Sequence, residues 1–181
     1  MNDASDTPDD GLELDAPRVL GATARAFEVA RAEELRRVLL ELAQQTRRTL
    51  DLVSRHLDPV LFDREDFVEA VKQLALGSPR ARVRVLILDP APVVASGHRL
   101  IPLAQRLSSY IEVRVPAPEH REFNEAWLVA DKDGYAHRRF SDRFEATVDF
   151  HDPRLATHLT NRFDELWHRA QADPNLRRLH L

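Results

Sequence analysis

The residue pair with the clearest chemical potential is His98-Arg99, which follows Gly97 and leads into a predicted helix. Free backbone N–H groups at a helix start favour an anion, and an arginine can grip a phosphate or carboxylate with two hydrogen bonds. Ligands of open α/β sheets also collect beyond the carboxyl ends of parallel strands, and polar residues follow two of the predicted strands. The predicted site for a small anion or phosphate comprises Ser54, Arg55, Asp89, His98 and Arg99. The structural alternative is that Arg99 pairs with Asp89 while His98 caps a neighbouring loop.

A second candidate is the basic segment that contains Arg138, Arg139 and Arg143. It could contact nucleic acid, with Trp127 and Tyr135 as the nearby aromatic side chains on which bases would stack. The structural alternative is a solvated edge strand whose charges prevent pairing with another chain. The whole chain carries a net charge of −4, so it has no global attraction for nucleic acid. The sequence therefore does not favour nucleic acid as the partner.

Metal and serine or cysteine chemistry find little support in the residue pattern. The chain has no cysteine, which excludes disulfides, thiolate metal sites and a cysteine nucleophile. A hydrolytic metal site built from His120, His137, His151, Asp149 and Asp152 would lack the His-x-x-x-His spacing that puts two ligands on one helix face. The Gly-x-Ser-x-Gly pattern of many serine hydrolases is absent. We therefore predict no metal and no cofactor.

Four helices are predicted to position these residues. Apolar side chains recur at helical spacing in the first, over 32–46: Leu35, Val38, Leu39 and Leu42. The second spans 64–76 with Asp63 as its N-cap, and the last spans 153–170 with Asp152 as its N-cap. The third ends near residue 107. Because proline is tolerated only in a first helical turn, Pro102 requires that this helix begin near residue 101 or kink there.

Seven strands complete the pattern, because alternating or continuous apolar runs occur between the helices. They are predicted over 26–29, 49–54, 82–88, 110–115, 126–130, 135–140 and 144–150. Helical crossovers imply parallel strands in the first half of the chain, whereas the turn signal Asp133-Gly134 implies antiparallel strands in the second. The predicted fold is a single α/β domain with one mixed sheet and helices on both faces.

The ends of the chain lie outside this domain in the prediction. Residues 1–17 are strongly acidic and contain no basic residue, which is typical of a disordered tail. They do not resemble a signal peptide, and no apolar stretch reaches the length of a membrane span. We expect the domain to cover residues 18–170, with 171–181 frayed, and we expect a cytoplasmic location.

The order of elements resembles one half of the phospholipase-D-like fold. In that superfamily each half carries the pattern His-x-Lys-x-x-x-x-Asp, in which the histidine is the nucleophile or proton donor and the lysine holds the phosphate. The matching segment here places Asn124, Ala126 and Asp131 at those three positions. An amide and a methyl group cannot replace an imidazole and an amine in covalent catalysis. The resemblance therefore implies a degenerate catalytic motif, and we do not expect an enzyme.

A closer resemblance covers residues 26–170. The chain is similar to an uncharacterised proteobacterial domain family of this fold that occurs alone or attached to GNAT acetyltransferases. The segments that carry the resemblance are 57–63, 81–86, 97–100, 107–109, 149–153 and 163–167. This chain has no acetyltransferase domain of its own, so it would be a stand-alone copy.

Three functions follow as hypotheses. The leading one is a non-catalytic, regulatory phospholipase-D-like module that binds a small anion, a phosphate ligand or a protein partner, including one of the acetyltransferase type. The resemblance also implies a homodimer, because halves of this fold pair face to face. The alternatives are a nucleic-acid-binding domain that uses the segment 137–143 and an unrecognised phosphoesterase that uses His98.

Overall fold

A seven-stranded mixed sheet forms the centre of the computed structural model, which describes residues 17–120 and 122–177. The strand order is β1-β7-β6-β5-β2-β3-β4. The strands are β1 (Phe27–Val29), β2 (Thr49–Ser54), β3 (Arg82–Ile87), β4 (Ile111–Arg114), β5 (Ala126–Ala130), β6 (Gly134–Arg138) and β7 (Ala146–Asp149). β2, β3 and β4 are parallel to one another, whereas β5, β6, β7 and β1 pair antiparallel. The predicted mixed α/β sheet is confirmed.

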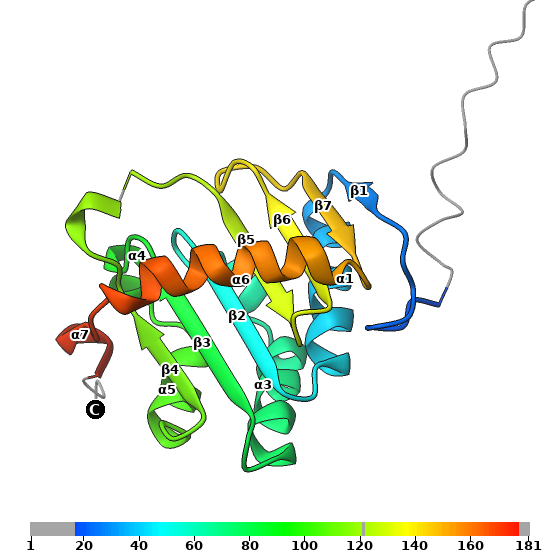
Figure 1. Ribbon diagram of the computed structural model, residues 1–181. Helices are drawn as coiled ribbons and strands as arrows, with labels where there is room; N and C mark the ends of the chain where they lie inside the picture. The colour runs from blue at the N-terminus through cyan, green and yellow to red at the C-terminus, as the bar shows by residue number, and fades with distance from the viewer. Residues whose placement is uncertain (1–16, 121, 178–181) are drawn as a thin grey trace, which may run out of the picture.

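Helices cover both faces of this sheet (Figure 1). They are α1 (Ala32–Gln45), α2 (Pro59–Phe62), α3 (Glu65–Gly77), α4 (Ala91–Ser96), α5 (Leu100–Arg106), α6 (Pro153–His168) and α7 (Pro174–Arg177). α6 crosses one face, while α1 and α3 lie on the other. The predicted stripe of α1 is buried throughout, from Leu35 to Leu42. None of these helices, in the part of the chain that the structure describes, is long and apolar enough to cross a membrane.

The layer under α6 forms a core of its own. Phe163 and Trp167 stack with their ring centroids 5.3 Å apart and pack with Trp127 of β5. The helix begins as predicted, because the Asp152 carboxylate accepts a hydrogen bond from the Leu155 N–H and Pro153 needs no hydrogen-bond partner for its nitrogen.

Two predicted helix starts have different outcomes. Asp63 does not cap α3, since Arg64 takes the N-cap position without a side-chain cap and the Asp63 carboxylate instead accepts from the Arg99 N–H at 2.9 Å. Pro102 lies in the first turn of α5, and α4 is a separate short helix. The helix therefore starts close to Pro102, as the first of the two predicted arrangements requires, and it has no kink there.

The β5–β6 hairpin turns two residues earlier than predicted. Its central residues are Asp131 and Lys132, which have φ of 53° and 61° as a tight hairpin turn requires. Gly134 is the first residue of β6, opposite Ala130. It is needed for space, because a Cβ there would lie 2.6 Å from the Leu20 Cδ1 and 3.0 Å from the Asp149 carbonyl oxygen.

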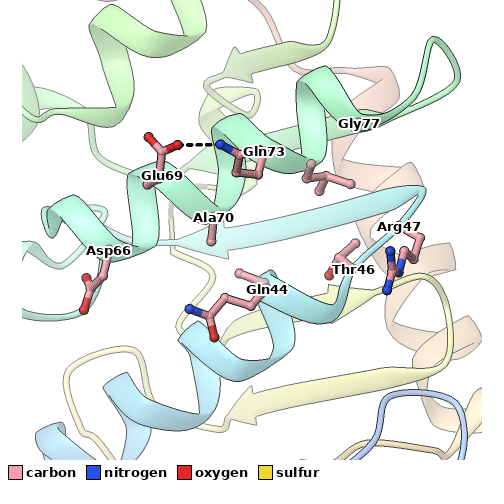
Figure 2. Close-up of a pocket in the computed structure, with 10 residues that line it drawn as sticks. Gln44, Thr46, Arg47, Asp66, Glu69, Ala70, Gln73 and Gly77 are labelled. Atoms are coloured by element: carbon pink, nitrogen blue, oxygen red, sulfur yellow. Dashed lines mark hydrogen bonds between the residues drawn. The ribbon is translucent and has the colours of Figure 1, made fainter.

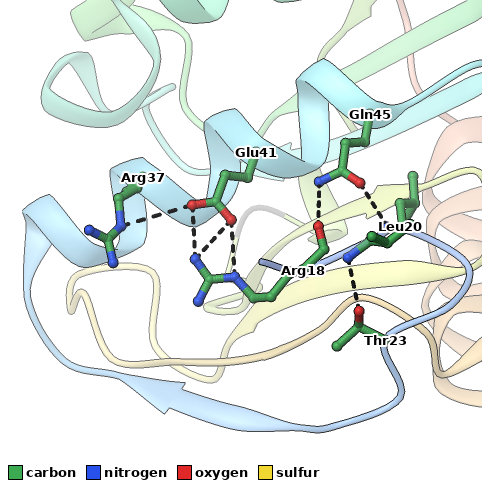
Figure 3. A network of polar contacts seen from close by, with 7 residues as sticks. Arg18, Leu20, Thr23, Arg37, Glu41 and Gln45 are labelled. Carbon is green, nitrogen blue, oxygen red and sulfur yellow. Dashed lines mark hydrogen bonds and ion pairs between the residues drawn. The ribbon is translucent and has the colours of Figure 1, made fainter. Parts of the chain in front are cut away.

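The chain that precedes β1 is fastened to α1 (Figure 3). The Arg18 guanidinium pairs with the Glu41 carboxylate at 2.8 Å, and the Gln45 amide donates to the Arg18 carbonyl and accepts from the Leu20 N–H. Residue 18 is therefore held against the rest of the domain. The predicted tail lies almost wholly in residues 1–16, outside the described residues.

The chain that follows α6 packs against β4 and α5. Gln171 pairs with Val115 through two backbone hydrogen bonds, and the Gln105 amide donates to the Leu176 carbonyl. The Leu176 side chain is buried. Residues 171–177 therefore extend the fold beside β4, and the rest of the predicted frayed end, 178–181, lies outside the described residues.

Candidate functional site

The five residues of the predicted anion site do not converge. His98 is only 6% exposed, and its Nδ1 accepts a hydrogen bond from the Leu100 N–H at 3.1 Å. Burial lowers the pKa of His98 to about 4, so the ring is neutral near pH 7 and offers no charge to an anion. Arg99 pairs with Asp63 rather than Asp89, because its Nη1 donates to the Asp63 carbonyl at 2.8 Å.

Ser54 has a structural contact at the end of β2. Its buried Oγ accepts from the Leu57 N–H at 3.0 Å and so holds Leu57 in the left-handed region, at a φ of 53°. Only Arg55 and Asp89 of the predicted set line a common cleft. This cleft of about 690 Å³ lies at the carboxyl ends of β2 and β3, where ligands of α/β sheets collect.

The charges of this cleft do not suit a phosphate. Its lining includes the carboxylates of Asp89, Glu122 and Asp173 against the single guanidinium of Arg55. The Arg55 Nη2 donates to the Phe123 carbonyl at 2.7 Å, which directs part of its hydrogen-bonding capacity into the protein. A surplus of carboxylates repels an anionic ligand, so the cleft gives little support to the small-anion hypothesis.

The residues that we aligned with the phospholipase-D pattern make hydrogen bonds and packing contacts within the domain. The Asn124 Oδ1 accepts from the Ser141 hydroxyl at 2.8 Å, and Ala126 is buried opposite Arg138. The Asp131 carboxylate accepts from three consecutive backbone N–H groups, those of Arg47, Arg48 and Thr49, at 2.7–2.9 Å. No lysine lies among the described residues that line the cleft.

The basic segment 137–143 divides into a buried arginine and two exposed ones. Arg138 is 4% exposed, and its guanidinium donates to the Asp58 carboxylate and to the carbonyls of Ser141 and Arg143. It therefore has no surface to offer to nucleic acid. β6 is also flanked by β5 and β7, so the predicted alternative of a solvated edge strand is wrong. Arg139 and Arg143 are exposed.

These two arginines line a groove of about 380 Å³, which we call the β6–β7 groove. Its floor is a row of residues on adjacent strands: Glu28 of β1 lies opposite Thr147 of β7, which lies opposite His137 of β6. The connection between β6 and β7 forms the rim with Arg139, Phe140, Arg143 and Glu145. Phe140 is 49% exposed, and the Arg143 guanidinium lies 5.0 Å from its ring centroid.

His137 is held in a fixed position on the floor. Its Nε2 lies 2.6 Å from the Glu125 carboxylate, which Arg162 of α6 binds with two hydrogen bonds of 2.6 and 3.0 Å. The Arg162 guanidinium, with a smaller contribution from His137, holds the pKa of Glu125 below its usual range. Glu125 is therefore ionised, and the His137 Nε2 carries the proton that it donates.

Comparison with known proteins assigns the chain to a family. A family model described as a domain of unknown function, DUF7931, matches residues 31–179. The chain belongs to this family. A search by sequence among curated proteins found no significant match.

Solved structures share the fold of the DUF7931 chain. TrmBL2, an archaeal chromatin protein that shows a novel mode of DNA binding, has a TM-score of 0.61 and 16% identity over 81% of this chain. The match covers 52% of TrmBL2, so the chain spans about half its length. Nuc, a phospholipase D family member from Salmonella typhimurium, has a TM-score of 0.56 and 16% identity, with coverage of 81% of this chain and 96% of Nuc. NucT from Helicobacter pylori has a TM-score of 0.52 and 8% identity, with coverage of 82% and 99%. The phospholipase-D-like fold is confirmed.

Sequence reasoning missed the aromatic residue of the groove. Trp127 and Tyr135, which we predicted as stacking side chains, are both 2% exposed and pack under α6. Phe140 was overlooked as a stacking residue, although it follows two arginines in the predicted strand 135–140. An apolar residue in a charged connection between strands was the available signal.

Two other features of the DUF7931 domain give less indication of a binding site. A hollow of about 540 Å³ is lined by residues of α1 and α3 (Figure 2). On its α3 side, Glu69 accepts a hydrogen bond from Gln73 of the same helix. No group of three metal-binding side chains converges in residues 17–120 and 122–177.

Proposed function

We propose that the DUF7931 chain is a non-catalytic phospholipase-D-like domain that binds single-stranded nucleic acid in the β6–β7 groove. The observation that carries this proposal is the exposed Phe140 ring, with the Arg143 guanidinium 5.0 Å from its centroid and Arg139 beside it. Aromatic side chains that stack bases, combined with cations that contact the backbone, are the common means of binding single strands. A duplex buries its base faces, so an isolated aromatic side chain suits a single strand better.

The fold is compatible with this function. TrmBL2 has the same fold and binds DNA. A fold hosts many functions, so this likeness supports the proposal only as a precedent, and the argument rests on the groove. The chain carries a net charge of −4, so the electrostatic attraction for nucleic acid must come from a local basic patch rather than from the whole surface.

The proposal that the domain is non-catalytic rests on residues 124–131, which we aligned with the phospholipase-D pattern, and on the cleft lined by Arg55 and Asp89. Asn124 and Ala126 supply neither a nucleophile nor a cation for a phosphate. The phosphoesterase hypothesis that used His98 loses its support because that side chain is buried and cannot reach a phosphodiester at the surface. Binding of a protein partner and pairing of two copies stay predictions.

The first test is salt-dependent binding. Fluorescence anisotropy of a labelled single strand of about 12 nucleotides should show binding that weakens steeply between about 50 and about 200 mM salt. Phe140→Ala should weaken binding by about 1–3 kcal/mol through lost stacking. Arg139→Ala and Arg143→Ala should each lower the slope of log K against log salt concentration by about 0.7.

Arg80→Ala provides the matched control. Arg80 is an exposed arginine in the connection between α3 and β3, away from the groove, so this variant changes the net charge by the same amount. It should bind like the unchanged chain. Absence of binding at low salt, or an equal loss in Arg80→Ala, contradicts the proposed function.

A further inference from the structure

We propose that the β6–β7 groove selects bases that carry an exocyclic amino group, with cytosine bound in preference to uracil. The selecting groups are the carboxylates of Glu28 and Glu145, which line the same groove as the two exposed arginines. This inference rests on the proposed function, and it adds a preference that stacking and phosphate contacts alone do not supply.

The carboxylates of Glu28 and Glu145 are unexpected in a groove that binds a polyanion. Next to a phosphate backbone each of them repels the ligand, unless it accepts a hydrogen bond from another part of that ligand. An ionised carboxylate can only accept, so its natural partner is a donor. Among the groups on a nucleic acid strand, the N–H groups of the bases and the ribose hydroxyls are such donors, whereas the phosphates are not.

Glu145 is available for this contact. It is exposed immediately before β7 and forms no hydrogen bond or ion pair with another residue in ranges 17–120 and 122–177. Glu145 lies in the connection that leads into β7 and lines the same groove as Thr147.

Glu28 supplies a second acceptor on the floor. Its Oε1 accepts from the Thr147 hydroxyl at 2.7 Å, which fixes the carboxylate next to Thr147 and leaves Oε2 for a ligand. Phe140 lines the same groove as these two carboxylates, so a base that stacks on the phenyl ring shares the groove with them.

A comparison of cytosine with uracil tests the carboxylate contact apart from stacking and backbone contacts. The two pyrimidines stack alike and share the same backbone, but cytosine presents an N4 amino donor where uracil presents the O4 acceptor. A carboxylate that faces position 4 accepts a hydrogen bond from the cytosine amino group but repels uracil O4. The one donor on that edge of uracil, N3–H, lies between O2 and O4, and both of these oxygens repel a carboxylate. The cost of an unmatched polar contact corresponds to about a tenfold difference in affinity.

The test compares labelled oligocytidine and oligouridine of about 12 nucleotides with the full chain at neutral pH and low salt. We expect oligocytidine to bind about tenfold more tightly. Glu145→Gln should reduce this ratio to about twofold or less, because an amide can also donate to O4. Glu28→Gln should reduce it as well. Glu65→Gln on α3, which covers the other face of the sheet, should keep the full ratio.

The outcomes separate the two proposals. Equal affinity for the two homopolymers, or a preference for uracil, overturns base selection and leaves the proposed function intact. A preference that survives in both Glu28→Gln and Glu145→Gln overturns the assignment to these carboxylates. Failure of the chain to bind either homopolymer overturns both proposals. Circular dichroism of each variant shows that it is folded, and both glutamates are exposed, so folding should be unaffected.

Discussion

At the scale of single residues, His98 shows how burial decides what a side chain can do. The pattern Gly97-His98-Arg99 predicted a cationic grip on an anion. In the structure the ring is enclosed, and it is held by the Leu100 N–H at Nδ1. Desolvation, which outweighs the attraction of the nearby Asp63 carboxylate, lowers the pKa of His98 to about 4.

This shift predicts a loss of stability in acid. The folded pKa lies below the ordinary value of 6.5, so between these values the unfolded chain binds more protons than the folded one. The contribution is complete above about pH 6.5 and is lost as the pH falls toward about 4, by about 3 kcal/mol in total. Urea unfolding measured across this range checks it. His98→Gln should flatten the dependence, and His158→Gln on the exposed side of α6 should not. An unchanged slope in His98→Gln would show that another group is responsible.

At the scale of elements, the β5–β6 hairpin holds the start of β2 in place. Asp131 stands in the turn and receives the backbone N–H groups of Arg47, Arg48 and Thr49, which connect α1 to β2. Asp131, which we aligned with the aspartate of the phospholipase-D pattern, thus has a structural role at this junction. The same junction positions β2, and with it Arg55 at the mouth of the cleft.

Removal of this carboxylate should destabilise the domain. Asp131→Ala loses three charge-assisted hydrogen bonds and places alanine at a φ of 53°, so we expect a loss of about 3 kcal/mol. Asp131→Asn keeps one acceptor oxygen and tolerates this backbone conformation, so it should lose about half as much. Urea midpoints at pH 7 provide the measurement, with Asp142→Ala in the exposed connection after β6 as the control. A control that loses as much as Asp131→Ala would refute the assignment.

At the scale of the whole molecule, one sheet joins two apolar cores. One core lies between the sheet and helices α1 and α3, and it includes Leu35, Val38 and Leu42 of α1. The other lies between the sheet and α6, and it includes both tryptophans, Trp127 and Trp167. The strands are shared, so neither layer can lose its packing without disturbing the other. We therefore expect a cooperative, two-state transition.

Tryptophan fluorescence can test this coupling, because it reports only on the α6 layer. Leu35→Ala leaves a cavity in the opposite layer and should cost about 2–5 kcal/mol. Its unfolding midpoint in urea should fall by the same amount whether it is measured by tryptophan fluorescence or by far-UV circular dichroism. If the fluorescence midpoint stayed unchanged while the circular dichroism midpoint fell, the two layers would unfold independently.

Local patterns were sufficient to predict most elements. The stripe from Leu35 to Leu42, the Asp152-Pro153 start of α6 and the strand periodicity depend on neighbours in the chain, so the sequence indicated them directly. The turn at Asp131-Lys132 was misplaced because Asp133-Gly134 is the stronger local signal. Gly134 is required by contacts with Leu20 and Asp149, which are distant in the chain.

The sequence by itself determined that this chain forms a mixed α/β domain without cysteine chemistry, and it indicated a strand without the residues for covalent phosphate chemistry. Only the tertiary structure decided which polar residues reach the surface. It buried His98, Arg138 and Trp127 and exposed Phe140 beside Arg143. The physical reason is that burial depends on which elements pack over a side chain, and this depends on strand order and helix placement rather than on residue type.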